Sequence, residues 1–230
     1  MHLHVSIRPS GRAGFTLVEL LVVISILAIL ISILMPSLRK ARGQAKETLC
    51  KTNQRSIYLA QSLLMEVRGK FQPLNNDPND GNWQYNYLIY DGRDWENFGP
   101  LITDKRLLSD VKLLYCPFQT DEFHSLDTSD NPWTPNDNMD TRASYGRRHL
   151  VTGKALSDFK KTIALFSDVM HMPKVIRSAH KRGVNATFLD GHVSFVPDPG
   201  IFLNNELGEP FDLLDNPIVE QIWLAMDKHQ

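Results

Sequence analysis

The order of hydrophobic and polar positions divides the chain into two unlike parts. From Phe15 to Met35 the sequence runs for 21 residues with a single charged side chain, Glu19. A helix of that length is about 30 Å long, which matches the thickness of a bilayer core. A helix of a soluble core would show a polar face, and this segment shows almost none. The pattern predicts a membrane-spanning helix over residues 15–35.

Beyond Pro36 the pattern becomes that of an amphipathic helix, with charged and amide side chains between small or apolar ones. The small or apolar positions recur at three- and four-residue steps: Leu38, Ala41, Ala45, Leu49, Thr52, Ser56, Leu59 and Leu63. We therefore expect one helix from about residue 15 to about residue 67. Its amphipathic part, residues 36–70, is expected to pack this stripe on a globular domain formed by residues 71–230.

Residues 71–230 show short periodic runs separated by turn-rich loops. Strands are predicted over residues 112–116 and 163–168. Short helices are predicted after Gly99-Pro100 and over residues 218–227, because proline is favoured in the first helical turn. The expected fold class is α+β: a long N-terminal hydrophobic helix packed on a small antiparallel sheet.

The clearest local signal in this part is a β-hairpin. Asp190-Gly191 stands between two alternating runs, residues 185–189 and 192–196. An Asp-Gly pair in this setting is the strongest indication of a two-residue hairpin turn. Direct pairing across such a turn would place four apolar side chains on one face, namely Ala186, Phe188, Val193 and Phe195.

Composition narrows the possible functions only slightly. The 230 residues include 25 basic and 26 acidic side chains, a formal net charge of −1, so no strong field favours nucleic acid. The two cysteines, Cys50 and Cys116, are too few for a disulfide scaffold or a thiolate metal cage. They can form one disulfide in an oxidising compartment, or remain two buried thiols, and the sequence leaves both alternatives open.

Three interpretations of the N-terminal segment compete. A cleaved secretory signal has a shorter apolar region that ends in small residues, which fits poorly. A plain signal anchor explains the length but not Glu19, since a charge at that depth costs about 3 kcal/mol and usually has a partner. The third interpretation is a prepilin.

The residues Gly14-Phe15-Thr16-Leu17-Val18-Glu19 resemble the class III signal of type IV prepilins and type II secretion pseudopilins. The resemblance implies that the leader, residues 1–14, is cut between Gly14 and Phe15 by a prepilin peptidase that then methylates the Phe15 amine. Pro36 stands where this family commonly has a helix-bending proline, although it can also simply mark the exit from the membrane.

Residue spacing agrees with this resemblance. Phe15 and Glu19 are four residues apart and share a helix face, so the new cationic amine can neutralise the carboxylate of its own or a neighbouring subunit. Basic residues flank both ends of the apolar segment, so the positive-inside rule predicts that the globular domain is cytoplasmic. The prepilin motif predicts the opposite, a domain outside the cytoplasm.

A second resemblance lies in the C-terminal half. His180 is followed by nine residues and then by Asp190-Gly191, which is similar to the prepilin-associated His-x9-Asp-Gly domain. Family members often carry arginine just before the histidine, and here the residue is Ala179. The resemblance supplies no biochemical activity for the motif.

Together these patterns imply a non-enzymatic pilin-like subunit with no catalytic residue, anchored in a bacterial inner membrane with its domain on the periplasmic side. The implied partners are the peptidase, an inner-membrane platform with its ATPase, other pilin-like subunits and the lipid bilayer, without nucleic acid. The filament would be a type II secretion or type IV pilus-like one. The alternative is a membrane-tethered periplasmic domain that binds a ligand or a metal through the His180/Asp190 region.

An acidic loop over residues 119–142 is a weak candidate for calcium, since carboxylate oxygens suit this ion. The candidate ligands are Asp127, Asp130, Asp137 and Asp140. No EF-hand pattern is present, and a solvated acidic loop explains the same residues. We expect no other cofactor.

Overall fold

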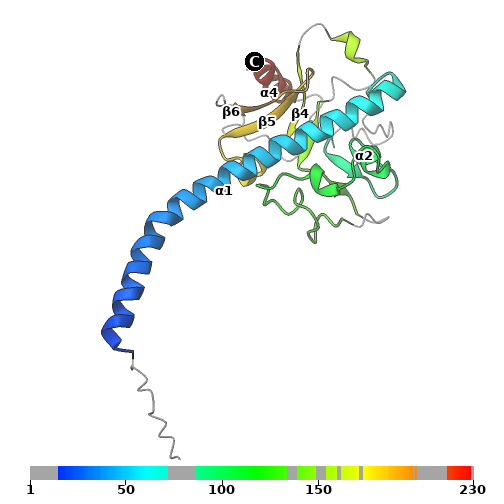
Figure 1. Ribbon diagram of the computed structural model, residues 1–230. Helices are drawn as coiled ribbons and strands as arrows, with labels where there is room; N and C mark the ends of the chain where they lie inside the picture. The colour runs from blue at the N-terminus through cyan, green and yellow to red at the C-terminus, as the bar shows by residue number, and fades with distance from the viewer. Residues whose placement is uncertain are drawn as a thin grey trace, which may run out of the picture. The chain divides into compact units, whose positions relative to one another are not determined.

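A computed structural model describes residues 15–71, 86–133, 139–148, 154–159, 162–170, 173–198, 200 and 217–228. The chain divides into two compact units, Met1–Ala45 and Lys46–Gln230, and each is described by itself. The fold is α+β: a long N-terminal helix, and antiparallel sheets in the second unit (Figure 1). The predicted leader, residues 1–14, lies outside the described residues and stays a prediction. The predicted domain boundary near residue 70 also stays a prediction.

Helix α1 spans Leu17–Arg68 and confirms the predicted long helix. It ends where Gly69 adopts a positive φ of 74° and donates its backbone N–H to Met65 O, 2.6 Å away. A left-handed residue after the last turn is the usual way to end a helix, and glycine adopts it without strain. Pro36 lies inside the helix and does not end it.

The face of α1 that packs in the second unit differs from the predicted stripe. Leu49, Leu59 and Leu63 of that stripe are 51%, 52% and 58% exposed. The buried residues lie one or two positions further along: Cys50, Asn53, Gln54, Ile57, Ala60, Gln61 and Met65. The predicted stripe is wrong because the buried face contains amide side chains, which a search for hydrophobic periodicity assigns to solvent.

Hydrogen bonds explain why amide side chains lie on the buried face. Asn53 Nδ2 donates to Tyr115 O at 3.1 Å, and Gln54 Nε2 donates to Asn185 O at 3.2 Å. Gln54 Oε1 accepts from Thr187 Oγ1 at 2.9 Å. Buried amides with such partners are tolerated, whereas the same amides without them would cost about 1–3 kcal/mol each.

The second unit contains one four-stranded antiparallel sheet in sequence order. Its strands are β3 (Tyr145–Arg147), β4 (Ala164–Asp168), β5 (Gly183–Phe188) and β6 (Val193–Pro197). A separate two-stranded sheet pairs β1 (Leu88–Tyr90) with β2 (Thr141–Arg142). The other elements are α2 (Gly99–Thr103), η1 (Val111–Leu114), η3 (Leu156–Asp158), α3 (Pro173–Ala179) and α4 (Pro217–Asp227).

The four-stranded sheet is covered on both faces. Thr187 of β5 and Asp168 of β4 bond to Gln54 of α1 on one face. On the other face a separate hydrophobic cluster contains Phe188 of β5 and Trp223 of α4. The strand β4 and the helices α2 and α4 confirm the predictions for those segments.

The strand predicted over residues 112–116 is wrong, because Val111–Leu114 form the 3-10 helix η1. Asp110 is its N-cap and accepts the backbone N–H of Lys112 at 2.9 Å. A capping aspartate favours a helical turn over an extended strand, and it outweighs the apolar run that suggested the strand.

The hairpin is real, but its register differs by one residue from the prediction. Thr187 pairs with Val193, and Phe188 N donates to His192 O at 3.0 Å. The loop therefore has three residues and ends at Gly191, whose φ is 82°. A three-residue loop with a left-handed glycine is the next most common hairpin type. Since a slip of one residue reverses the faces, Phe188 stacks on His192 (ring centroids 4.3 Å apart), and the predicted apolar face is wrong.

This loop docks on α1. Arg55 Nη1 donates to Gly191 O, and Tyr58 Oη donates to Leu189 O at 2.8 Å. A Cβ atom at Gly191 would overlap the Tyr58 ring. The glycine is therefore required both by its positive φ and by the close approach of the helix.

We predict that Gly191→Ala destabilises the protein far more than Gly69→Ala. Both glycines have positive φ, which costs an alanine about 1–2 kcal/mol. Only Gly191 would also clash with Tyr58, because nothing lies within 4 Å of a Cβ at Gly69. Urea unfolding of the detergent-solubilised chain measures the difference, which should exceed about 1 kcal/mol. Equal losses would show that Tyr58 does not restrict this turn.

A second prediction concerns His124, whose Nδ1 donates to Ala143 O at 3.0 Å. Burial lowers the pKa of His124 to about 4, against the opposing effects of this hydrogen bond and of Asp121; Arg142 lowers it further. The unfolded chain binds a proton near pH 6.5 that the folded chain does not. The contribution of His124 to stability should therefore be full above about pH 6.5 and decline toward pH 4.

The decline attributable to His124 should be on the order of 3 kcal/mol. Unfolding free energies of wild type and His124→Asn, measured between pH 4 and pH 7, test it, since asparagine keeps a donor near Ala143 O but does not titrate. The variant should show a flatter profile. Parallel profiles would contradict the assignment.

Candidate functional site

The first candidate site is the N-terminal part of α1. An 18-residue window of this helix has a mean hydropathy of 3.0, and none of it is buried within the structure. By length and composition it is the one helix among the described residues that is able to cross a membrane. This segment must be covered by lipid or by other protein, since exposed apolar surface of this extent is unfavourable in water.

Glu19 closes the start of this helix. Its Oε2 accepts from Thr16 N at 2.9 Å and from Thr16 Oγ1 at 2.7 Å, while Thr16 Oγ1 lies 3.2 Å from Glu19 N. This reciprocal arrangement is a capping box, which satisfies backbone donors that have no partner inside the helix. The sequence contains the signature of this capping box, a threonine three residues before a glutamate, and the hydrophobic pattern alone does not reveal it. Gly14 lies outside the described residues.

The remaining polar side chains of the apolar segment are satisfied within the helix. Ser25 Oγ donates to Leu21 O, and Ser32 Oγ donates to Ile29 O, both at 2.7 Å. Such internal bonds suit a helix in lipid, where no water is available to serve hydroxyl groups. Glu19 is the single charged side chain of residues 15–35, and it is the polar group of this segment that a partner would have to neutralise.

The structure places the two ends of the His-x9-Asp-Gly motif in different surroundings. The Asp190 side chain is 54% exposed and lies 2.6 Å from Nδ1 of His192. The His180 side chain, directly after α3, is 4% exposed. Asp190 contacts His192, and Gly191 contacts α1. His180 belongs instead to a buried cluster, so the described contacts do not join the two ends of the motif.

This buried cluster, the second candidate site, converges on Nε2 of His180. The nearest atoms are Cys116 Sγ at 3.3 Å, Cys50 Sγ at 3.5 Å, Asp168 Oδ2 at 3.2 Å and Asn185 Nδ2 at 3.0 Å. Both cysteines are free and buried, and Asp168 is buried as well. The residues come from α1, from the segment after η1, from β4, from the turn after α3 and from β5, so the cluster joins the helix to the sheet.

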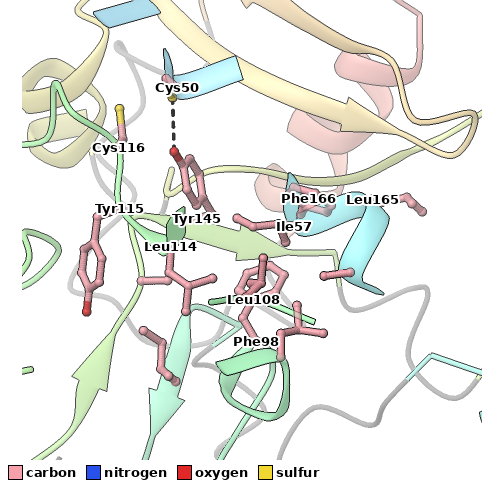
Figure 2. Close-up of a cluster of buried hydrophobic side chains, with 14 of the residues drawn as sticks. Cys50, Ile57, Phe98, Leu108, Leu114, Tyr115, Cys116, Tyr145, Leu165 and Phe166 are labelled. Atoms are coloured by element: carbon pink, nitrogen blue, oxygen red, sulfur yellow. Dashed lines mark hydrogen bonds between the residues drawn. The ribbon is translucent and has the colours of Figure 1, made fainter. Parts of the chain in front are cut away.

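Neighbouring donors surround the cluster. Tyr145 Oη lies 3.5 Å from Cys50 Sγ, and Figure 2 shows this contact with Cys116 nearby. Gln54 Nε2 donates to Asp168 Oδ1 at 3.2 Å, and the backbone N of Asn185 donates to Asp168 Oδ2 at 2.6 Å. Donors of this kind stabilise negative charge on a carboxylate or a thiolate.

The electrostatics of the cluster separate its two thiols. Burial raises the pKa of Cys50 well above its usual value. A hydrogen bond from Cys50, assisted by His180, lowers the pKa of Cys116 to about 5 despite burial. Burial opposes charge on His180, but the Asp168 carboxylate and Cys116 raise its pKa to about 9. Burial also raises the pKa of Asp168, to about 7.

Sequence reasoning identified Cys50 and Cys116 as a possible disulfide and His180 as a family residue, without joining them. The structure brings all three together with Asp168, and the two sulfur atoms lie within 4.8 Å of one another as free thiols. Asp168 and Asn185 belong to neither of these two predictions, because the cluster members are too far apart in sequence to form a compact motif.

The calcium candidates do not converge in the part of the chain that the structure describes. Asp140 pairs with Arg142 at 2.9 Å, and Asp127 accepts the backbone N–H of Trp133 at 3.4 Å. Among the described residues, Asp127, Asp130 and Asp140 do not gather into a group that could hold a metal ion. Asp137 lies outside the described residues, so calcium binding stays a prediction.

Comparison with known proteins gives two matches. The family model described as "Prokaryotic N-terminal methylation motif" matches residues 9–35. The type IV major pilin protein PilA of Myxococcus xanthus (strain DK1622) is 33% identical over 85 residues, which is 35% of this chain. The alignment covers 38% of that relative, so the chain spans well under half of its length. No solved structure matches.

Proposed function

We propose that this type IV pilin-like chain is a structural subunit that is held in the bacterial inner membrane by its N-terminal helix and is then assembled through that helix into a filament. The observation that carries the proposal is the coincidence of two features. The methylation motif matches residues 9–35, and from Leu17 onward this range lies in a helix whose apolar surface is uncovered. Lipid can cover this surface before assembly, and the helices of like subunits can cover it afterwards.

Processing would complete the site. In this proposal a prepilin peptidase cuts between Gly14 and Phe15 and methylates the new amine. The amine would then stand one residue before Thr16, which already holds the Glu19 carboxylate at the start of the helix. A cation at this position offsets the cost of placing the carboxylate in the membrane, and methylation leaves its charge in place.

The exposed stripe of α1 in the second unit supports assembly. Leu49, Leu59 and Leu63 are more than half exposed on a helix whose opposite face is buried in the domain. We propose that this leucine stripe contacts the helices of neighbouring subunits. Burial of one leucine contributes about 1.5–3 kcal/mol when it is complete.

We further propose that the domain lies on the periplasmic side, and that an inner-membrane platform with its ATPase drives assembly of a type II secretion or type IV pilus-like filament. A subunit of this kind needs no catalytic residue. The tethered-domain alternative requires His180 and Asp190 to act together, whereas His180 is buried and Asp190 is exposed beside His192.

Intact-mass spectrometry of the protein recovered from its host membranes tests the proposal. We expect a chain that begins at Phe15 and carries one extra methyl group. A chain that retains the leader untrimmed would overturn the prepilin interpretation. A separate measurement, recovery of Glu19→Leu in sheared filaments, distinguishes assembly from tethering. A tether tolerates this change, because it only removes a charge from the membrane, while an assembling subunit should stop entering filaments.

A further prediction concerns the leucine stripe. The double variant Leu59→Gln with Leu63→Gln should keep its unfolding free energy within about 0.5 kcal/mol per site, because both side chains are exposed. Its incorporation into sheared filaments should fall by roughly tenfold per leucine. Lys105→Gln, an exposed change outside α1, is the control and should assemble normally. Normal assembly of the double variant would exclude the stripe as a contact surface.

A further inference from the structure

We propose that Cys50, Cys116, Asp168 and His180 form a structural Zn²⁺ site. The inference goes beyond filament assembly and does not depend on it. These four residues supply thiol, carboxylate and imidazole groups, and their ligand atoms all lie within 4.8 Å of one another. Sulfur, nitrogen and oxygen donors of this kind are the ones that bind zinc in proteins.

Four contacts between the proposed ligand groups, which involve both carboxylate oxygens of Asp168, are close to the separations of a tetrahedral zinc centre. With the usual zinc–donor distances, tetrahedral geometry separates a nitrogen from an oxygen by about 3.3 Å, and a sulfur from a nitrogen or oxygen by about 3.5 Å. His180 Nε2 lies 3.2 Å from Asp168 Oδ2. Cys50 Sγ lies 3.4 Å from Asp168 Oδ1 and 3.5 Å from His180 Nε2, and Cys116 Sγ lies 3.3 Å from the same nitrogen.

Hydrogen bonds alone account poorly for this crowding. One imidazole nitrogen carries either one hydrogen or one lone pair. Nevertheless two sulfurs, a carboxylate oxygen and the Asn185 amide all lie within 3.5 Å of His180 Nε2. A cation at the centre of the four ligand atoms would bind all of them at once.

The charge of the cluster also favours a cation. Two thiolates, a carboxylate and a neutral imidazole carry a charge of −3, and Zn²⁺ reduces it to −1. Buried charge without compensation is costly. Donors next to the anionic ligands complete the compensation: Tyr145 Oη and Asn185 Nδ2 lie 3.5 Å from Cys50 Sγ, and Gln54 Nε2 lies 3.2 Å from Asp168 Oδ1. Partners in this position orient zinc ligands and tune their affinity.

The site would be structural because it is closed. Cys50, Cys116 and Asp168 are buried, and the His180 side chain is 4% exposed, so four protein ligands complete the coordination without an open position. The ligands come from α1, the segment after η1, β4 and the turn after α3. Zinc would therefore bind the helix to the sheet, and its binding free energy would contribute to folding.

The test uses the full chain, purified in detergent without chelators. Elemental analysis should find one zinc per chain. After the zinc is removed under reducing conditions, added Co²⁺ should give the visible bands of tetrahedral cobalt together with a thiolate-to-cobalt charge-transfer band. Chelation should lower Tm, and added Zn²⁺ should restore it.

Variants separate the proposed ligands from their surroundings. Cys116→Ser and Asp168→Asn should abolish the cobalt spectrum or strongly weaken zinc binding. Tyr145→Phe keeps the shape of the core and removes the hydroxyl beside Cys50, so it should weaken zinc binding about tenfold. His192→Ala, which changes the exposed histidine of the β5–β6 hairpin, is the control and should bind zinc as the wild type does.

Two results would overturn the inference. One is a reduced, folded chain that binds neither Zn²⁺ nor Co²⁺ more tightly than Cys116→Ser does. The other is protein from the native host whose mass, two hydrogens lower, shows a Cys50–Cys116 disulfide. A zinc site lost in the variants but not in the control supports it. Because processing and filament entry are measured separately, failure of this proposal leaves the proposed function untouched.

Discussion

The second unit depends on one constraint: Cys50, Asn53 and Gln54, polar side chains that α1 buries, need partners in the domain. Asn53 and Gln54 meet backbone and side-chain groups of the domain, and Cys50 meets His180 and Asp168. Each bond is modest, but leaving one such group unpaired would cost about 1–3 kcal/mol. Hydrophobic packing alone would allow the helix several positions, and the hydrogen bonds select one of them.

The first unit obeys the opposite constraint. Its helix surface is apolar over residues 20–35, its serines bond to their own backbone, and Glu19 is held by Thr16. A surface of this kind is compatible with lipid or with identical helices, and with little else. One helix thus combines a segment that requires hydrogen-bond partners with a segment that avoids them, and the change of side-chain chemistry along α1 accounts for the difference.

Sequence patterns predicted the long helix, β4, α4 and the existence of the hairpin, because each depends on local periodicity or capping. They failed where a distant contact decides. The buried face of α1 carries Asn53 and Gln54, whose partners lie more than 60 residues away. The hairpin register depends on a three-residue loop that closes against Tyr58. The cluster around His180 was missed for the same reason, since its members come from separate elements.

The hydrogen bonds of Asn53 and Gln54 also set the angular position of α1 about its own axis. A rotation by one residue, about 100°, would carry both amides away from Tyr115 O and Asn185 O. The leucine stripe at Leu49, Leu59 and Leu63 is therefore aimed in a fixed direction relative to the sheet. In the proposed filament, the rotational setting of this single helix would decide how neighbouring subunits meet, and a mutation in the interior of the domain would alter the filament without touching any contact between subunits.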